Sequence, residues 1–323
     1  MQYLFSIDTG FNPFSTAEMA ADHSPSKPSP RRVVFFLVLT TVLWGGSFVF
    51  NKLGFREIPP LTFAFYRFSL ATLLMGVLCI GRLPRLTRDI VGKGCAVGLA
   101  LASANLSFVL GLNETTVSRA GFLNNLFVLF VPLLGFLFWR ERISRFLVFG
   151  IALALIGLWL LTQGGTAGFG RGDLLSTICA LCIAAHILAV SKILKEEDVY
   201  LVTLVQLATV TVISGVLSFV FAPAPAPFGP VSIGALVYCA IFPTVLCFTL
   251  QNTWQRHTTP AQAGLIYTLD PVWSMIGGML VLGERLSGME WTGCALIFAG
   301  IAVPAGILRF LERKNLSLYR RET

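Results

Sequence analysis

Charged residues are scarce in this chain. They make up 12% of its 323 residues, whereas hydrophobic residues make up 55%. A soluble domain carries about a quarter charged residues, so this chain does not have the surface of an ordinary soluble protein. The composition indicates a protein embedded in lipid.

The chain also lacks the residue clusters on which many enzymes depend. It has three histidines, no Walker-type phosphate loop and no HxxxH, DxxD or ExxH pattern. We therefore expect no metal, no cofactor and no ATP hydrolysis. The formal net charge of +8 does not indicate a nucleic-acid partner, because the basic residues lie between apolar runs, as membrane topology requires.

What the chain does contain is a series of long apolar runs. Backbone groups in lipid must be hydrogen-bonded within their own segment, so each run predicts a helix. We expect an all-α integral membrane protein with about ten transmembrane helices. They are predicted at residues 33–53, 61–80, 92–112, 119–139, 146–163, 172–193, 200–222, 231–253, 261–282 and 290–308.

The basic residues predict the orientation of these spans. With ten spans both termini lie on one side, which carries eighteen Lys and Arg residues against five on the other. The positive-inside rule then places both termini in the cytoplasm. Residues 1–32 form a linker-like tail without a signal peptide, and residues 309–323 form a basic tail. Short loops and the absence of targeting signals favour a bacterial inner membrane.

The chain contains an internal repeat. At a shift of 143 residues, 14 of the 43 positions from 115 to 157 are identical, against roughly one in twelve expected by chance. We expect two five-helix units, residues 33–163 and 172–308. Because five is odd, the second unit must enter the membrane inverted. Inverted repeats recur in secondary transporters, where exchanging the conformations of the halves opens a central site to either side.

Several motifs carry a family resemblance. They are Trp44-Gly45-Gly46-Ser47-Phe48, Pro60 with Arg67, Val131-Pro132-Leu133-Leu134, Asp270-Pro271-Val272, and the ERxS turns at Glu141 and Glu284. Their order and spacing resemble the EamA branch of the drug/metabolite transporter superfamily. The resemblance implies a central cavity surrounded by the first, third, fourth, sixth, eighth and ninth spans. Asp270 and His186 depart from the family's usual residues.

Polar residues within the spans are the candidates for contacting a solute, because they are costly in a bilayer core and tend to face a cavity or a partner helix. The alternative is that they serve as interhelical hydrogen-bonding groups. Adjacent amides point about 100° apart, so one of each pair should face inward. The candidates, with two aromatic walls, are Trp44, Asn105, Asn124, Asn125, His186, Gln251, Asn252, Tyr267, Asp270 and Trp273.

Three ionisable candidates lie well inside the predicted spans, away from the span ends. Asp270 precedes a proline and could bind a proton or a cationic group of the substrate, or stabilise a helix kink. His186 could take part in proton coupling. Arg67 could meet an anionic substrate, but we favour a structural role in which it reaches the interface or pairs with a carboxylate.

Other residues are expected to be structural. Glu141 and Glu284 end their spans and are interpreted as turn stabilisers. Gly150, Gly157, Gly293 and Gly300 form pairs seven residues apart, which permits close helix packing within the fold or in a homodimer.

The sequence therefore predicts a secondary transporter. It would move a small metabolite, an amino-acid-like compound or a drug by alternating access, as an exporter. An integral-membrane enzyme acting on lipid-linked substrates and a membrane scaffold that transports nothing remain as alternatives.

The inverted repeat makes a testable prediction about topology. Ser144 and Ser287 occupy equivalent positions in the two copies, so inversion places them on opposite sides of the membrane. Cysteines introduced there one at a time, in a background without native cysteines, should react with an impermeant maleimide from opposite sides. Labelling of both from the same side of intact cells would refute the inversion.

Overall fold

The computed structural model describes residues 28–140, 148–150, 152–153, 156–157, 159–160, 168–194, 197–223, 227–258 and 260–300. This part of the chain consists of helices and turns and contains no strand, which confirms the predicted all-α class. Large apolar side chains point away from the protein, with Phe219 and Leu280 exposed by 92% and 80%. A surface of this kind is suited to lipid.

Five helices are long and continuous. They are α1 (Pro30–Gly54), α2 (Pro60–Cys79), α3 (Arg88–Glu114), α7 (Arg171–Ile193) and α8 (Val199–Phe221). A short 3-10 helix, η1 (Ile80–Arg85), extends α2. Proline at the first position of α1 and α2 suits a helix start, because the first N–H groups of a helix have no intrahelical partner.

The remaining helices are interrupted. One stretch consists of α9 (Pro230–Ala240), the π-helical segment η2 (Ile241–Leu246), α10 (Cys247–Trp254) and η3 (Gln255–His257). Two others are broken by two-residue turns: α4 (Val117–Asn124) with α5 (Phe127–Trp139), and α11 (Pro260–Tyr267) with α12 (Asp270–Leu282). Residues 288–300 are also helical.

Seven of the described stretches are long and apolar enough to cross a membrane. They correspond to the predicted spans one to four and six to eight. The predicted ninth span is divided into two short helices, of which α12 is the longer apolar one. The predicted fifth and tenth spans, residues 146–163 and 290–308, lie partly outside the described residues.

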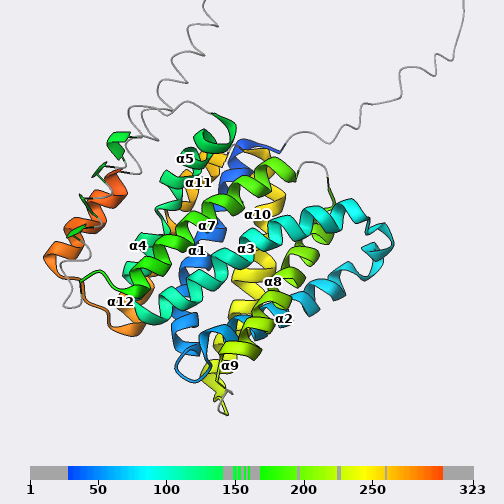
Figure 1. The fold of residues 1–323 in the computed structure, drawn as a ribbon, viewed down its shortest axis with the longest axis horizontal. Helices are drawn as coiled ribbons and strands as arrows, with labels where there is room; N and C mark the ends of the chain where they lie inside the picture. Colours follow the sequence, from blue (N-terminus) through cyan, green and yellow to red (C-terminus); the bar gives the residue numbers. More distant parts are fainter. Residues whose placement is uncertain are drawn as a thin grey trace, which may run out of the picture.

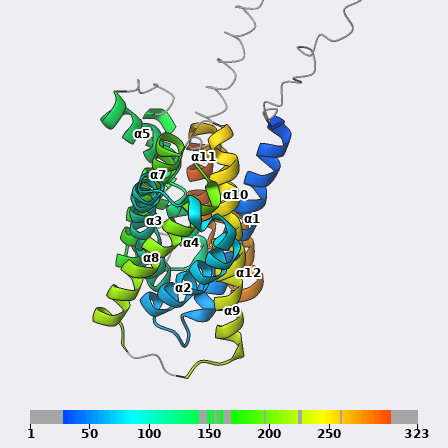
Figure 2. The same ribbon diagram turned by 90° about the vertical axis from the view of Figure 1, so that its right-hand side faces the viewer.

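The two halves of the chain interlock. Helix α1 packs against α9, α10, α11 and α12, whereas α7 packs against α3, α4 and α5. Figures 1 and 2 show α1 running between the ends of the bundle beside the helices of the second half. In Figure 2, α3, α7 and α8 lie together on the opposite side from α1, α9 and α12. Each half therefore completes its core with the first helix of the other.

Ion pairs and helix caps join the helices at one end of the bundle. Lys52, near the end of α1, donates from Nζ to the carbonyls of Leu112 at 2.7 Å and Thr115 at 2.8 Å, which satisfies the last turn of α3. Glu284, just after α12, accepts hydrogen bonds from the backbone N–H groups of Val117 at 2.7 Å and Ser118 at 3.0 Å. Its carboxylate therefore caps α4. Glu141, its counterpart in the repeat, lies outside the described residues.

A buried ion pair lies at the same end. Arg119 of α4 donates to Asp173 of α7 at 2.7 Å, and their side chains are 9% and 3% exposed. Asp173 also accepts from the Thr115 hydroxyl at 2.8 Å and from the Gly170 N–H at 3.0 Å. The carboxylate therefore has both a charge partner and hydrogen-bond donors, as a buried charge requires.

The loop between α1 and α2 caps another helix. Glu57 accepts a 2.7 Å hydrogen bond from the Gly229 N–H, at the start of α9. Hydrogen bonds from Ser232 and from the Gly229 backbone lower the pKa of the Glu57 carboxyl below its ordinary value. This carboxylate links the first half of the chain to the second.

The opposite end of the bundle has its own ion pairs. Arg82 contacts Asp198 at 2.9 Å, and Lys93 contacts Glu197 at 2.6 Å. The two pairs join η1 and the first turns of α3 to the connection between α7 and α8. These partly exposed pairs contribute little individually to stability.

All four glycines of the pairs spaced seven residues apart are buried: Gly150, Gly157, Gly293 and Gly300. A Cβ on Gly157 would be 2.7 Å from the Gly293 carbonyl oxygen and 2.7 Å from the Ile297 nitrogen. Two helices of the same chain therefore approach at Gly157 and Gly293 too closely to admit a side chain.

The buried ion pair generates a stability prediction. Asp173→Asn leaves Arg119 buried without a countercharge, so we expect the free energy of unfolding to fall by about 3 kcal/mol. The measurement is unfolding of the purified protein by titration with a denaturing detergent. Glu114→Gln is the matched control, since it removes the exposed 3.7 Å contact with Arg171 and should change stability by less than about 1 kcal/mol. Equal, small losses in both variants would contradict this role of the pair.

Candidate functional site

A cavity of about 110 Å³ lies between the two halves of the bundle. Helices α1, α2, α3, α4 and α5 line it from the first half, and α7, α10, α11 and α12 from the second. Its walls combine aromatic rings with a few polar groups, as small-molecule sites do. The lining residues are Trp44, Ser47, Phe48, Arg67, Leu101, Ala104, Asn105, Phe108, Asn124, Phe127, Cys179, Ile183, His186, Ile187, Phe248, Gln251, Tyr267 and Asp270.

The two helix breaks bring four of these residues to the cavity. Helix α4 ends at Asn124 and α5 begins at Phe127, while α11 ends at Tyr267 and α12 begins at Asp270. Shifted by 143 residues, the bounds of α4 and α5 coincide with those of α11 and α12. The repeat seen in the sequence is therefore also a repeat of helix breaks, and both breaks contribute to one cavity.

Five polar groups of the lining contain a buried atom without a hydrogen-bond partner. The atoms are Arg67 Nη1, Asn105 Oδ1, Asn124 Oδ1, Gln251 Oε1 and Asp270 Oδ1. Most buried polar groups in proteins are hydrogen-bonded, because leaving one unpaired is costly. The described residues contain thirteen such atoms, and five of them surround this one cavity, where a bound solute that donates and accepts hydrogen bonds would satisfy them.

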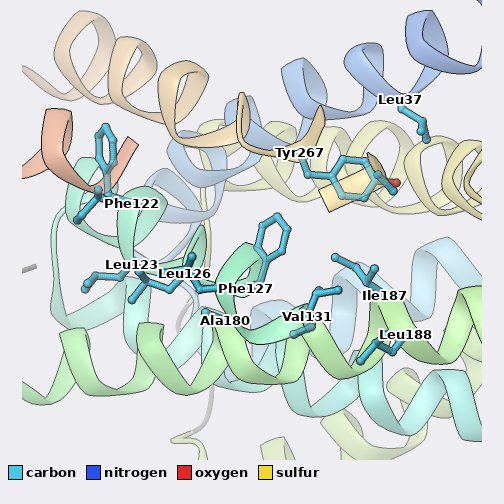
Figure 3. Packing of buried hydrophobic residues seen from close by; sticks show 14 of the residues in the cluster. Leu37, Phe122, Leu123, Leu126, Phe127, Val131, Ala180, Ile187, Leu188 and Tyr267 are labelled. Carbon is cyan, nitrogen blue, oxygen red and sulfur yellow. The ribbon is translucent and has the colours of Figure 1, made fainter. Parts of the chain in front are cut away.

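Aromatic rings form much of the remaining wall. Trp44 packs against Tyr267 with ring centroids 5.3 Å apart, and Phe48 packs edge-on against Phe108 at 4.9 Å. Figure 3 shows Phe127 and Tyr267 facing one another from the two broken helices, and their ring centroids are 6.5 Å apart. Apolar groups of a solute would be buried against these rings.

Gln255 holds two lining residues in place. Its Oε1 accepts hydrogen bonds from Gln251 Nε2 at 2.8 Å and from the Tyr267 hydroxyl at 3.1 Å. Its Nε2 donates to the Ile187 carbonyl at 3.1 Å and to the Ser191 hydroxyl at 3.0 Å. Because Gln251 Nε2 is bound to Gln255, the unpartnered Gln251 Oε1 is the amide atom that can accept a hydrogen bond from a solute in the cavity.

A second buried amide, Gln206 of α8, fixes His186. The Gln206 Oε1 accepts from Asn252 Nδ2 at 3.0 Å, so its Nε2 is the donor toward His186 Nε2 at 3.2 Å. His186 Nε2 is then an acceptor, which assigns the neutral tautomer with the proton on Nδ1. Gln206 lies outside the spans that the family resemblance places around the cavity. Its role as a partner of His186 is shown by its contacts with α7 and α10 in the folded protein.

Seven of the ten predicted contact residues line the cavity, and three do not. Asn125 lies in the turn between α4 and α5, where both polar atoms of its side chain are buried without partners. Asn252 points toward α8 and donates to Thr203 and Gln206. Trp273 donates to the Thr41 hydroxyl of α1 at 3.2 Å. Of each adjacent amide pair, one member faces the cavity: Asn124 and Gln251.

Arg67 lies in the lining, although its sequence context favours a structural role. Its side chain is 2% exposed, and no carboxylate among the described residues lies within ion-pairing distance. The part of the chain that the structure describes also contains no group of three or more His, Cys, Asp or Glu residues that could hold a metal ion.

A family model agrees with both halves of the chain. The EamA-like transporter family matches residues 31–163 and again residues 170–304. The two matches together cover most of the chain, and each contains one of the helix breaks that line the cavity.

Curated relatives extend over most of the chain. An "Uncharacterized transporter" from Archaeoglobus fulgidus is 27% identical over 267 residues, which is 83% of this chain and 83% of the relative. A "Probable amino-acid metabolite efflux pump" from Salmonella typhimurium is 24% identical over 294 residues, covering 84% of this chain and 94% of the relative. A protein of the same name from Escherichia coli is also 24% identical, with 84% and 94% covered.

A solved crystal structure shares the fold. Its TM-score to this chain is 0.67 at 20% sequence identity, and the match covers 88% of this chain and all of the other. At this level of identity the likeness concerns the arrangement of the helices alone.

Proposed function

Because this chain belongs to the EamA-like transporter family, we propose that it exports a small amino-acid-like metabolite by alternating access. It is an integral membrane protein, and its family and relatives are transporters. We place it in a bacterial inner membrane with both termini in the cytoplasm, as the distribution of basic residues favours.

One observation carries the choice of solute. The cavity combines a guanidinium, a carboxyl group and several amides, each with a buried unpartnered atom, within walls of aromatic rings. An amino acid presents groups that complement them: a carboxylate, an ammonium and a side chain that can be buried. We propose that Asp270 receives the ammonium group. The two relatives named as amino-acid metabolite efflux pumps support the same solute class.

Two features support alternating access. The equivalent breaks of α4–α5 and α11–α12 put half-helix ends at the cavity from both repeats, an arrangement that recurs in transporters. Lys52, Glu284 and the Arg119–Asp173 pair tie α3 and α4 to α1, α7 and α12 at one end of the bundle. We propose that these contacts close the cavity at that end and separate when the repeats exchange conformations.

Filling the cavity tests the proposed transport. In proteoliposomes loaded with a panel of L-amino acids, we expect at least one to show protein-dependent flux. Ala104 lines the cavity, so Ala104→Phe places a ring in the space that the solute needs and should reduce that flux by more than about tenfold. The measurement is radiolabelled counterflow with protein that elutes as a single species.

Ser103→Phe is the matched control. It adds a similar ring to the neighbouring residue of α3, which is exposed on the outside of the bundle, so flux should persist. Asp270→Asn should remove any preference for a free amino group over its N-acetylated form. Absence of flux for every compound tested, from folded protein, would refute the transport proposal and favour a scaffold.

A further inference from the structure

Arg67 sits in the cavity as a charged group without a countercharge. It is 2% exposed, and its nearest ring contact is Phe68, with the guanidinium carbon 5.2 Å from the ring centroid. No described carboxylate pairs with it, and Nη1 is buried without a partner. A buried arginine in a membrane protein that neither reaches the interface nor pairs within the chain is a candidate for binding an anion.

One hydrogen bond fixes the orientation of this guanidinium. Arg67 Nε donates to the hydroxyl oxygen of Thr244 at 2.7 Å, and Thr244 is fully buried. The same hydroxyl donates its single proton to the Cys239 carbonyl at 2.6 Å. Since a hydroxyl has only one proton, Thr244 can only accept from Arg67. Arg67 Nε is therefore hydrogen-bonded within the protein, and the Nη groups can bind a ligand in the cavity.

Thr244 lies in the π-helical segment η2, directly after Pro243, and this proline explains why the Thr244 hydroxyl donates to the Cys239 carbonyl. Pro243 has no N–H, so the Cys239 carbonyl loses the donor that an α-helix would supply. The Thr244 hydroxyl replaces that donor. The Pro243 carbonyl in turn accepts a 3.1 Å hydrogen bond from Trp44 Nε1. The Pro243-Thr244 pair therefore positions a charged and an aromatic residue of the cavity, and π-bulges are frequent at functional sites.

We propose that Arg67 is the anion-binding group of the cavity and that Thr244 is its positioning residue, so that the transported solute must carry a carboxylate. This inference rests on the proposed function and assigns one of its binding groups. Two Nη atoms of a guanidinium can bind both oxygens of a carboxylate, which an amide in the same place cannot reproduce. Asp270 has no ion pair with Arg67, so each is free to bind a different end of a zwitterion.

The test compares each amino acid with its carboxamide. The probes are L-leucine, L-phenylalanine and L-methionine with their amides, and binding to the purified full-length protein is measured at equilibrium from the ligand dependence of thermal unfolding. We expect the wild-type protein to bind at least one acid about tenfold or more tightly than its amide. Arg67→Gln should remove this preference.

Thr244 variants separate positioning from folding. Thr244→Val keeps the shape but removes the hydroxyl, and should weaken binding of the acid about tenfold while leaving the amide nearly unchanged. Thr244→Ser retains a hydroxyl and should restore the preference for the acid. Thr249→Val is the matched control, because the Thr249 hydroxyl donates only to the Val245 carbonyl of its own helix and should not affect either ligand.

The outcomes distinguish this inference from the proposed function. Equal binding of acids and amides, or no binding of any probe, overturns the inference. A preference for the acid that Thr244→Val does not reduce overturns the positioning role. If amino acids are transported without any preference for the carboxylate, the proposed function stands and the anion site does not. If the preference is present but no probe is transported, the site stands and the transport proposal fails.

Discussion

A bilayer core offers no water to polar groups, and this constraint organises the protein. Many hydroxyls of the described helices donate to carbonyls of their own helix, as Ser214 does toward Val210 and Thr253 toward Thr249. The charges of Arg119 and Asp173 are buried together. Of the thirteen buried side-chain atoms without a partner among the described residues, five surround one cavity and belong to Arg67, Asn105, Asn124, Gln251 and Asp270. They mark the place where a polar solute, instead of the protein, can complete the hydrogen bonds.

The helix breaks provide that place without exposing backbone to lipid. Both breaks lie inside the bundle, at equivalent positions of the two repeats, and both put helix ends against the cavity. The π-helical segment adds a third irregularity, whose freed Cys239 carbonyl is satisfied by Thr244. Irregular backbone at membrane depth is tolerated where it is enclosed by protein or lines a cavity. The same irregularities position Asn124, Tyr267, Asp270 and Arg67. The interruptions of the helices therefore determine which polar groups face the cavity.

Much of this arrangement could be predicted from the sequence. Hydropathy locates the apolar helices because their length is set by the bilayer, and polar residues within them are rare enough to suggest a cavity. Periodicity could show that one member of each amide pair faces inward, but not which one. The packing of α4 and α10 determines that Asn124 and Gln251 are the members that face the cavity. The break within the predicted ninth span has no composition signal beyond Asp270-Pro271.

The roles of Gln206, Gln255 and Arg67 depend on contacts between helices distant in the chain. Gln206 acts through His186, and Gln255 acts through Tyr267 and Gln251. The sequence favours a structural role for Arg67, because a lone arginine in a span usually reaches the interface or finds a carboxylate. In the structure its hydrogen-bond partner is the hydroxyl of Thr244, 177 residues away in the sequence and directly after a proline. No local pattern around Arg67 encodes that contact.

An experimental structure of the protein in lipid nanodiscs with a transported amino acid bound would locate the solute. We expect density for the solute within the cavity, with its carboxylate at the Nη atoms of Arg67 and its amino group at Asp270. Density for the solute elsewhere in the protein, with Arg67 still bound only to Thr244, would contradict this expectation.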